Sequence, residues 1–188
     1  MPATAETIGV RSVVRGRAGR RRTLDERLLL RVPSLFRLLT RASLRLPPGS
    51  RLRRTLLARR MGQAYAAANR GDFEVVLAGM DLGTYEYRPS RDLLPPDLED
   101  VFHGKEGYLR LWRYWTDAFR DIRWDPEEVL DLGDRFLVTT ELSGHGSGSG
   151  IGVSKPVYQL ITIRDGLVIR QEDFLDRGVA LAAAIGED

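Results

Sequence analysis

The fold is decided by residues 161–176, which read ITIRDGLVIRQEDFLD. Two segments of alternating apolar and polar residues flank the pair Asp165-Gly166, the strongest short-range signal for a tight β-hairpin. Near the end of the second segment, Asp173 falls on the side that we expect to face the interior. A carboxylate in an apolar interior is costly unless it is paired or has a function. The hairpin therefore predicts a β-sheet and a candidate functional residue.

Outward from the hairpin, apolar periodicity predicts the other elements. The predicted helices cover residues 24–46, 51–69, 73–79, 105–121 and 178–185. The predicted strands cover residues 84–88, 123–131, 135–145, 155–164 and 167–175. Helices come first and a run of antiparallel strands follows, which is typical of an α+β fold with helices on one face of a curved sheet.

Charge divides the chain into three parts. Residues 1–60 hold 16 arginines against three acids, a net charge of +13, whereas residues 61–188 hold 13 basic and 23 acidic side chains, a net charge of −10. Residues 1–23 are rich in arginine without sustained periodicity, and we expect this arm to be disordered. Residues 24–50 predict an amphipathic helical extension, and residues 51–188 the folded domain.

The basic arm and helix allow several partners. Nucleic acid or anionic lipid would suit the charge, but the arm lacks the interleaved aromatic residues of nucleic-acid binders, so contact with the acidic domain is favoured. The amphipathic helix could lie on a membrane surface, and the favoured interpretation is that it covers a groove on its own domain or a partner subunit. The chain has no cysteine and no uncharged apolar run of about 18 residues, so we expect a cytoplasmic protein without disulfides.

Four motifs resemble the nuclear transport factor 2-like superfamily, in the same order along the chain. They are residues 65–74 (YAAANRGDFE), 102–107 (FHGKEG), 164–168 (RDGLV) and 174–176 (FLD). The branch that they resemble is the SnoaL-like group, over roughly residues 51–185. The resemblance implies a cone-shaped, curved antiparallel sheet with helices packed on its concave face, a conical pocket, and often a homodimer. It leaves the reaction open, because this scaffold serves isomerases, cyclases, epoxide hydrolases, dehydratases and non-catalytic binders.

Asp173 is the leading catalytic candidate. Counting outward from the turn without irregularity pairs Asp173 with Tyr158, puts Gln171 on the same interior face, and puts Gln159 on the outer face. Desolvation would raise the pKa of such a carboxyl toward neutrality, which suits an acid or base. The ending also resembles that of limonene-epoxide hydrolases, whose catalytic Asp would correspond to Asp173, but the Arg and second Asp of that family are missing here. The alternative is a structural carboxyl that hydrogen-bonds to Tyr158 or a helix end.

Three polar residues before the long helix are further candidates. Arg88 occupies the position of the catalytic Asp in ketosteroid isomerases, and an arginine cannot act as that base. Arg88 could bind an anionic group with Glu86 as its partner, and the alternative is a surface ion pair. His103, at a loop-to-helix junction, predicts either a general base or a hydrogen bond that orients the loop.

Tyr65, Trp112, Trp115 and Gln171 complete the candidate ligand-binding set. We expect no metal, because the two histidines are far apart in sequence without companion carboxylates at ligand spacing. We also expect no nucleotide, because the glycine-rich residues 144–150 lack the ending of a phosphate loop. No cofactor is therefore predicted.

Together these features predict a protein that binds a hydrophobic small molecule. Asp173 and Tyr158 would carry out acid–base chemistry without a cofactor, as in an isomerase, cyclase or hydrolase. The alternative is a non-catalytic ligand-binding or protein-interaction module whose basic arm binds an acidic partner. Whether the protein is an enzyme stays open at this point.

Overall fold

The computed structural model describes residues 6–9, 21–48 and 50–186. The helices are α2 (Leu24–Arg31), α3 (Pro33–Leu44), α4 (Arg51–Asn69), α5 (Phe73–Leu77), the 3-10 helix η1 (Arg91–Leu93), α6 (Gly104–Ala118) and α7 (Arg177–Ile185). The strands are β1 (Glu6–Gly9), β2 (Glu86–Arg88), β3 (Phe102–His103), β4 (Phe119–Asp131), β5 (Arg135–Gly146), β6 (Gly152–Arg164) and β7 (Leu167–Phe174). The order of elements is that of the predicted α+β fold.

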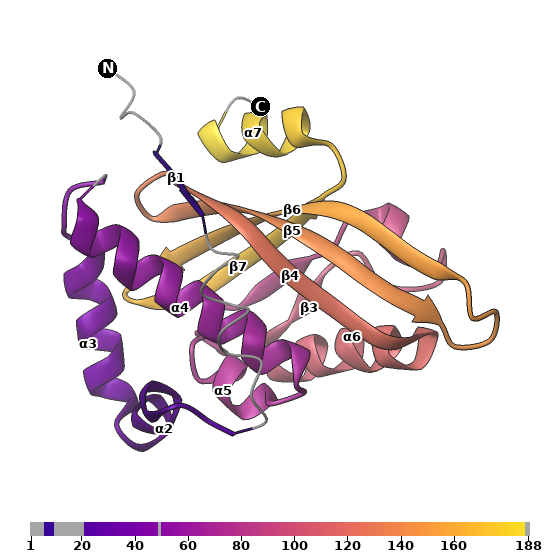
Figure 1. Ribbon diagram of the computed structural model, residues 1–188, viewed down its shortest axis with the longest axis horizontal. Coiled ribbons are helices and arrows are strands. Elements are labelled where there is room, and N and C mark those ends of the chain that lie inside the picture. Colours follow the sequence, from indigo (N-terminus) through magenta and orange to yellow (C-terminus); the bar gives the residue numbers. More distant parts are fainter. Residues whose placement is uncertain (1–5, 10–20, 49, 187–188) are drawn as a thin grey trace.

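The strands form one curved sheet in the order β1-β4-β5-β6-β7-β2-β3. The helices α4, α5 and α6 cover one face, and α2 and α3 flank them (Figure 1). Two details differ from the prediction. Strand β2 runs parallel to β7, so the sheet is mixed rather than wholly antiparallel. Helix α7 packs on the opposite face, where Ala180 and Ala184 meet Leu137 and Leu160, so the helices do not all share one side.

Helix α4 is fixed to the sheet by a buried ion pair. Arg53 and Asp131 are each 1% exposed, and two N–H groups of Arg53 donate to the two carboxylate oxygens of Asp131 at 2.7 Å. The other three N–H groups of Arg53 donate to the carbonyl oxygens of Leu44, Leu46 and Gly133. Because both charges are fully hydrogen-bonded, this pair fixes the position of α4 and of the chain that precedes it.

Part of the N-terminal arm is ordered. Residues Glu6–Gly9 form β1, which pairs antiparallel with β4 at residues Glu128–Asp131, so the predicted disorder is wrong for this segment. Its pairing uses backbone groups at a free sheet edge, which needs no apolar periodicity in the sequence. Residues 1–5 and 10–20 lie outside the described residues, and disorder stays a prediction for them.

The hairpin from β6 to β7 has the predicted turn and a shifted register. Asp165 and Gly166 both have positive φ, at 53° and 82°, as a two-residue hairpin turn requires. Beyond it, Ile163 pairs with Val168 but Thr162 pairs with Arg170, so Ile169 is an extra residue in a β-bulge. Because of this extra residue, every later residue of β7 pairs with a residue of β6 that was predicted to lie on the other face of the sheet.

The bulge has a cause outside the hairpin. The Val168 N–H donates to the Gly79 carbonyl at 3.0 Å, and the Asp81 N–H donates to the Val168 carbonyl at 2.9 Å. Met80 and Val168 form a parallel bridge at the same place. The loop after α5 therefore holds the start of β7, whereas the rest of β7 pairs with β2.

Candidate functional site

A cavity of about 110 Å³ lies between the sheet and the helices. Its wall is mainly apolar and includes seven aromatic side chains: Phe36, Tyr65, Tyr87, Tyr108, Trp112, Trp115 and Trp124. The rings of Tyr87, Tyr108, Trp112, Trp115 and Trp124 pack against one another. The ring centroids are 5.8 Å apart for Trp112 and Trp115, and 5.1 Å apart for Trp115 and Trp124. This cavity is the candidate site.

Asp173 lies directly behind the cavity wall and is 5% exposed. The Tyr87 hydroxyl donates to its Oδ2 at 2.7 Å, and Gln159 Nε2 donates to its Oδ1 at 2.8 Å. The Tyr65 hydroxyl in turn donates to Gln159 Oε1 at 2.5 Å. Tyr65, Tyr87 and Gln159 all line the cavity, so a hydrogen-bonded chain joins the buried carboxyl to the cavity.

Burial raises the pKa of Asp173 to about 7, and the hydrogen bonds from Tyr87, Gln159 and Gln171 oppose this shift. All three partners are neutral, so they stabilise the carboxylate less than a cation would. Burial also raises the pKa of Tyr65 and Tyr87 well above the ordinary value. At neutral pH, both protonation states of Asp173 are therefore populated, while the two tyrosines stay protonated.

The predicted pair of Tyr158 and Asp173 is wrong. The bulge places Gln159 opposite Asp173 and Tyr158 opposite Phe174. Tyr158 lies on the opposite face, against a cluster that we call the α7 cluster and that comprises Leu137, Leu160, Ala180 and Ala184. Gln159 points to the interior, although it was predicted to lie on the outer face. The prediction held for Gln171 and Asp173, which face inward, because β7 keeps its alternation beyond the bulge, whereas the residues of β6 that pair with them are shifted by one.

Three other candidates lie away from the cavity. His103 is exposed at the start of α6 and pairs with Glu86 across β2 and β3. Arg88 donates to Glu86 at 3.0 Å on the exposed side of β2. Glu86 and Arg88 therefore form the surface ion pair of the alternative interpretation, and neighbouring Tyr87 points to the interior.

Tyr65, Trp112, Trp115 and Gln171 line the cavity. Sequence reasoning missed Tyr87 and Gln159, which hold Asp173. The alternation of β2 could have put Tyr87 on the inner face, since Glu86 and Arg88 are both charged. No local signal could have placed Gln159, because its orientation depends on the bulge.

The N-terminal extension forms part of the cavity wall. Glu26 and Leu29 of α2 and Phe36 of α3 line it, and Glu26 and Leu29 are 2% and 6% exposed. Two of these three side chains are apolar, and the extension buries them against the domain. The extension therefore covers part of this cavity, whereas Leu35, Leu38 and Leu39 of α3 are exposed.

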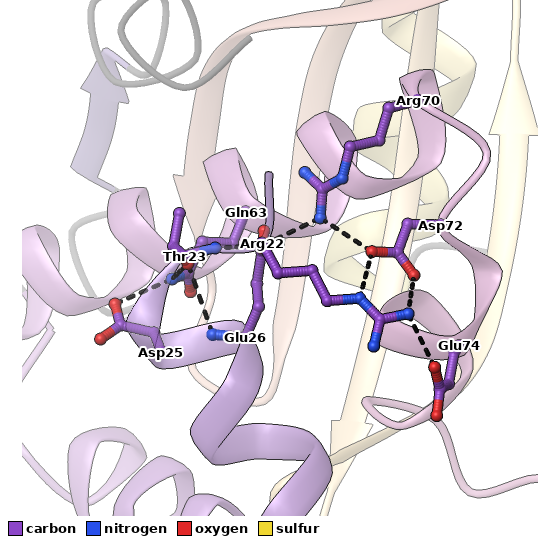
Figure 2. Close-up of polar contacts among 8 residues, drawn as sticks. All are labelled: Arg22, Thr23, Asp25, Glu26, Gln63, Arg70, Asp72 and Glu74. Atoms are coloured by element: carbon purple, nitrogen blue, oxygen red, sulfur yellow. Dashed lines mark hydrogen bonds and ion pairs between the residues drawn. The ribbon is translucent and has the colours of Figure 1, made fainter. Parts of the chain in front are cut away.

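Helix α2 is held by a polar network that we call the α2 network (Figure 2). It comprises Arg22, Thr23, Asp25, Glu26, Gln63, Arg70, Asp72 and Glu74. Arg22 donates twice to Asp72 at 2.8 Å and once to Glu74 at 2.7 Å. Arg70 lies 2.9 Å from Glu26 and 3.2 Å from Asp72. Partial burial opposes ionisation of Asp72, but the bonds from Arg22 and Arg70 outweigh it and lower the pKa of this carboxyl.

Two further properties concern metals and membranes. Among residues 6–9, 21–48 and 50–186, no three histidine or acidic side chains gather as a metal site would require. Within the same residues, no helix combines the length and apolarity needed to cross a membrane.

The comparison with protein families assigns the chain. Residues 62–171 match the model of the SnoaL-like domain, and the chain belongs to this family. The match confirms the resemblance noted in the sequence. Among curated proteins, none matches this sequence.

Solved structures with the same fold agree. TerC, co-crystallised with polyporic acid, is 25% identical, with a TM-score of 0.54 over 66% of this chain and 93% of TerC. A nuclear transport factor 2-like protein of unknown function from Burkholderia pseudomallei is 20% identical, with a TM-score of 0.55 over 65% and 91% of the two chains. IdmH from Streptomyces antibioticus, a candidate polyketide cyclase, is 17% identical, with a TM-score of 0.53 over 67% and 95%. The nuclear transport factor 2-like fold is thereby established.

Proposed function

We propose that this protein binds a hydrophobic small molecule in its cavity and transfers a proton to or from it without a cofactor, as an isomerase, cyclase or hydrolase does. The observation that carries the proposal is Asp173, a buried carboxyl whose pKa is raised to about 7 directly behind the wall of an aromatic cavity. An acid–base group works best when its pKa is near the working pH.

The proton would travel through Tyr87. Its hydroxyl donates to Asp173 Oδ2, and Tyr87 itself lines the cavity. When the Tyr87 oxygen accepts a proton from the ligand, its own phenolic proton moves to Asp173, and the reverse transfer returns it. Tyr87 is then the group that contacts the ligand, and Asp173 acts through it.

The comparisons support the binding part of the proposal. TerC carries polyporic acid in its co-crystal structure and is 25% identical over almost its whole length, which favours a small organic ligand for this chain as well. The aromatic wall suits a ligand with a flat apolar body. A non-catalytic binder would share the cavity but would show no proton transfer.

Exchange of carbon-bound hydrogen tests the proposal. The aromatic ketone α-tetralone would be incubated with the protein in heavy water, and deuterium uptake beside the carbonyl followed by NMR. We expect uptake faster than in buffer, and a loss of about tenfold or more in Asp173→Asn and Tyr87→Phe. Tyr158→Phe, on the opposite sheet face, is the matched control and should keep the wild-type rate. Binding without exchange would refute the acid–base role.

A further inference from the structure

One cation in the cavity wall has hydrogen-bonding capacity that the protein does not use. Arg60 of α4 lines the cavity, and its guanidinium carbon lies 5.1 Å from the centroid of the Phe36 ring. Its Nη2 donates to the Gly166 carbonyl at 3.1 Å. Both of these partners are neutral. Its Nη1 is buried and has no hydrogen-bond partner among the described residues, which is costly for a charged donor.

Arg53, two turns earlier on the same helix, is an example of a fully hydrogen-bonded guanidinium in this protein. All five of its N–H groups have acceptors, and its charge faces Asp131. Arg53 thus serves the fold. Arg60 has no acid partner of this kind among the described residues, and its contacts are Gly166 and Phe36.

A second open donor lies in the same wall. The indole Nε1 of Trp124 is buried without a partner among the described residues, and Trp124 lines the cavity. The acidic residues that line the cavity are already bound, since Asp25 accepts from Gln63 at 2.8 Å and Glu26 pairs with Arg70. The open groups of the wall are therefore donors, and one of them is cationic, which suits an acceptor-rich ligand.

We infer that the ligand of this cavity is a hydrophobic anion whose carboxylate or ionised enol oxygen accepts from Arg60, while its apolar body packs against the aromatic wall. This inference rests on the proposed function and names its ligand class. A carboxylate or enolate would supply the acceptor that Nη1 lacks and would neutralise the buried charge.

The position of Arg60 separates this contact from the acid–base group. Arg60 contacts Gly166 in the turn that starts β7, and Asp173 lies near the other end of that strand. Burial lowers the pKa of Arg60 to about 10, so its side chain remains cationic at neutral pH. The ligand would therefore be held by its charge at one end, with its body directed toward Tyr87 and Asp173.

Matched ligands test the inference by titration calorimetry. The probes are β-naphthoate and its neutral analogue β-naphthamide, with wild type, Arg60→Gln and Arg51→Gln. Arg51 is an exposed arginine on the same helix, so Arg51→Gln makes the same change in charge away from the cavity. We expect the acid to bind wild type and Arg51→Gln about tenfold more tightly than the amide, and Arg60→Gln to lose this preference.

Two results would overturn the inference. One is an acid that binds wild type no more tightly than the amide, including the case in which it does not bind; the other is a preference that survives in Arg60→Gln. Amide binding with no preference for the acid would leave the proposed function intact. The deuterium-exchange experiment with α-tetralone tests that function independently.

Thermal stability gives a second readout that needs no ligand. Arg60→Met removes an unpaired buried charge and keeps an apolar stem, so its Tm should equal or exceed that of wild type. Arg53→Met, which leaves Asp131 buried and unpaired, should lower the Tm markedly. A fall in Arg60→Met as large as that in Arg53→Met would show that Arg60 serves the fold, and would contradict a ligand-binding role.

Discussion

The pKa values of two aspartates of this protein are shifted in opposite directions. Asp173, behind the cavity wall, has only neutral hydrogen-bond partners, and burial raises its pKa to about 7. Asp72, in the α2 network, is also partly buried, but Arg22 and Arg70 outweigh the burial and lower its pKa. The comparison teaches that neighbours, rather than burial alone, separate a carboxyl that can exchange its proton from one that fastens two parts of a fold.

The largest expected effect concerns the pH dependence of stability at Asp173. Its folded pKa of about 7 lies above the unfolded value of about 3.9, so the folded state binds the proton more tightly and stability falls as pH rises between these values. Three units amount to about 4 kcal/mol. Urea unfolding from pH 4.5 to 8 should show this fall in wild type relative to Asp173→Asn. Parallel curves for the two proteins would contradict the raised pKa.

Removing a cation from the α2 network should have the next largest effect. Arg70→Gln leaves Glu26, which is 2% exposed, without its ion-pair partner, and should lower the free energy of unfolding by about 3 kcal/mol. Arg123→Gln is the control, because it breaks an ion pair with Asp125 that is about half exposed on both sides and should cost about 0.5 kcal/mol or less. Similar losses in both variants would mean that the network adds little.

Tyr87→Phe should increase the difference between the pKa values of Asp173 and Asp72. The change removes a donor to the Asp173 carboxylate, so the pKa of Asp173 should rise further, and stability should fall by about 1 kcal/mol, mainly at pH values where this carboxyl is ionised. Tyr158→Phe should leave the pKa of Asp173 unchanged, because Tyr158 faces the α7 cluster. Carboxyl NMR titration of both variants provides the measurement. A shift caused by Tyr158→Phe would support the register without the bulge.

Arg22→Gln should have the smallest effect, and it should decrease the difference between the pKa values of Asp173 and Asp72. Arg22 is more exposed than Asp72, and Arg70 remains in place, so the pKa of Asp72 should rise only part of the way to its ordinary value. Stability from Asp72 is present above the unfolded pKa and is lost as pH falls through the lower folded pKa. The acid unfolding midpoint, below about pH 4, should therefore move slightly upward. An unchanged midpoint would exclude Arg22 from this role.

The sequence predicted the features that depend on local patterns. The bounds of α4 follow from apolar spacing between Pro48 and Gly71, and the Asp165-Gly166 turn follows from two residues that tolerate positive φ. The apolar spacing of the predicted helix over residues 105–121 includes Trp112 and Trp115, and both are buried in the structure. The inward position of Asp173 was also predicted, because β7 keeps its alternation beyond Ile169.

Features that depend on distant contacts were not predictable in the same way. Gly79 and Asp81 hold Val168 and so produce the bulge that replaces Tyr158 by Gln159 beside Asp173. The sequence does not distinguish Arg53 from Arg60, because both lie in a segment with 16 arginines. Only the folded structure shows that the guanidinium of Arg53 is fully hydrogen-bonded, whereas Nη1 of Arg60 has no partner among the described residues. Glu26 stands near the start of a predicted helix, and no pattern in the sequence indicates that it is 2% exposed and paired with Arg70.

The most direct measurement of the central claim is the pKa of the Asp173 carboxyl in the whole protein. Aspartate labelled with carbon-13 at the carboxyl would be titrated by NMR, with Asp173→Asn to assign the signal. The account predicts a pKa of about 7 for Asp173 and a lowered pKa for Asp72. A value for Asp173 at or below the free value of about 3.9 would contradict the account, because it would mean a solvated or cation-paired carboxylate with no acid–base role at neutral pH.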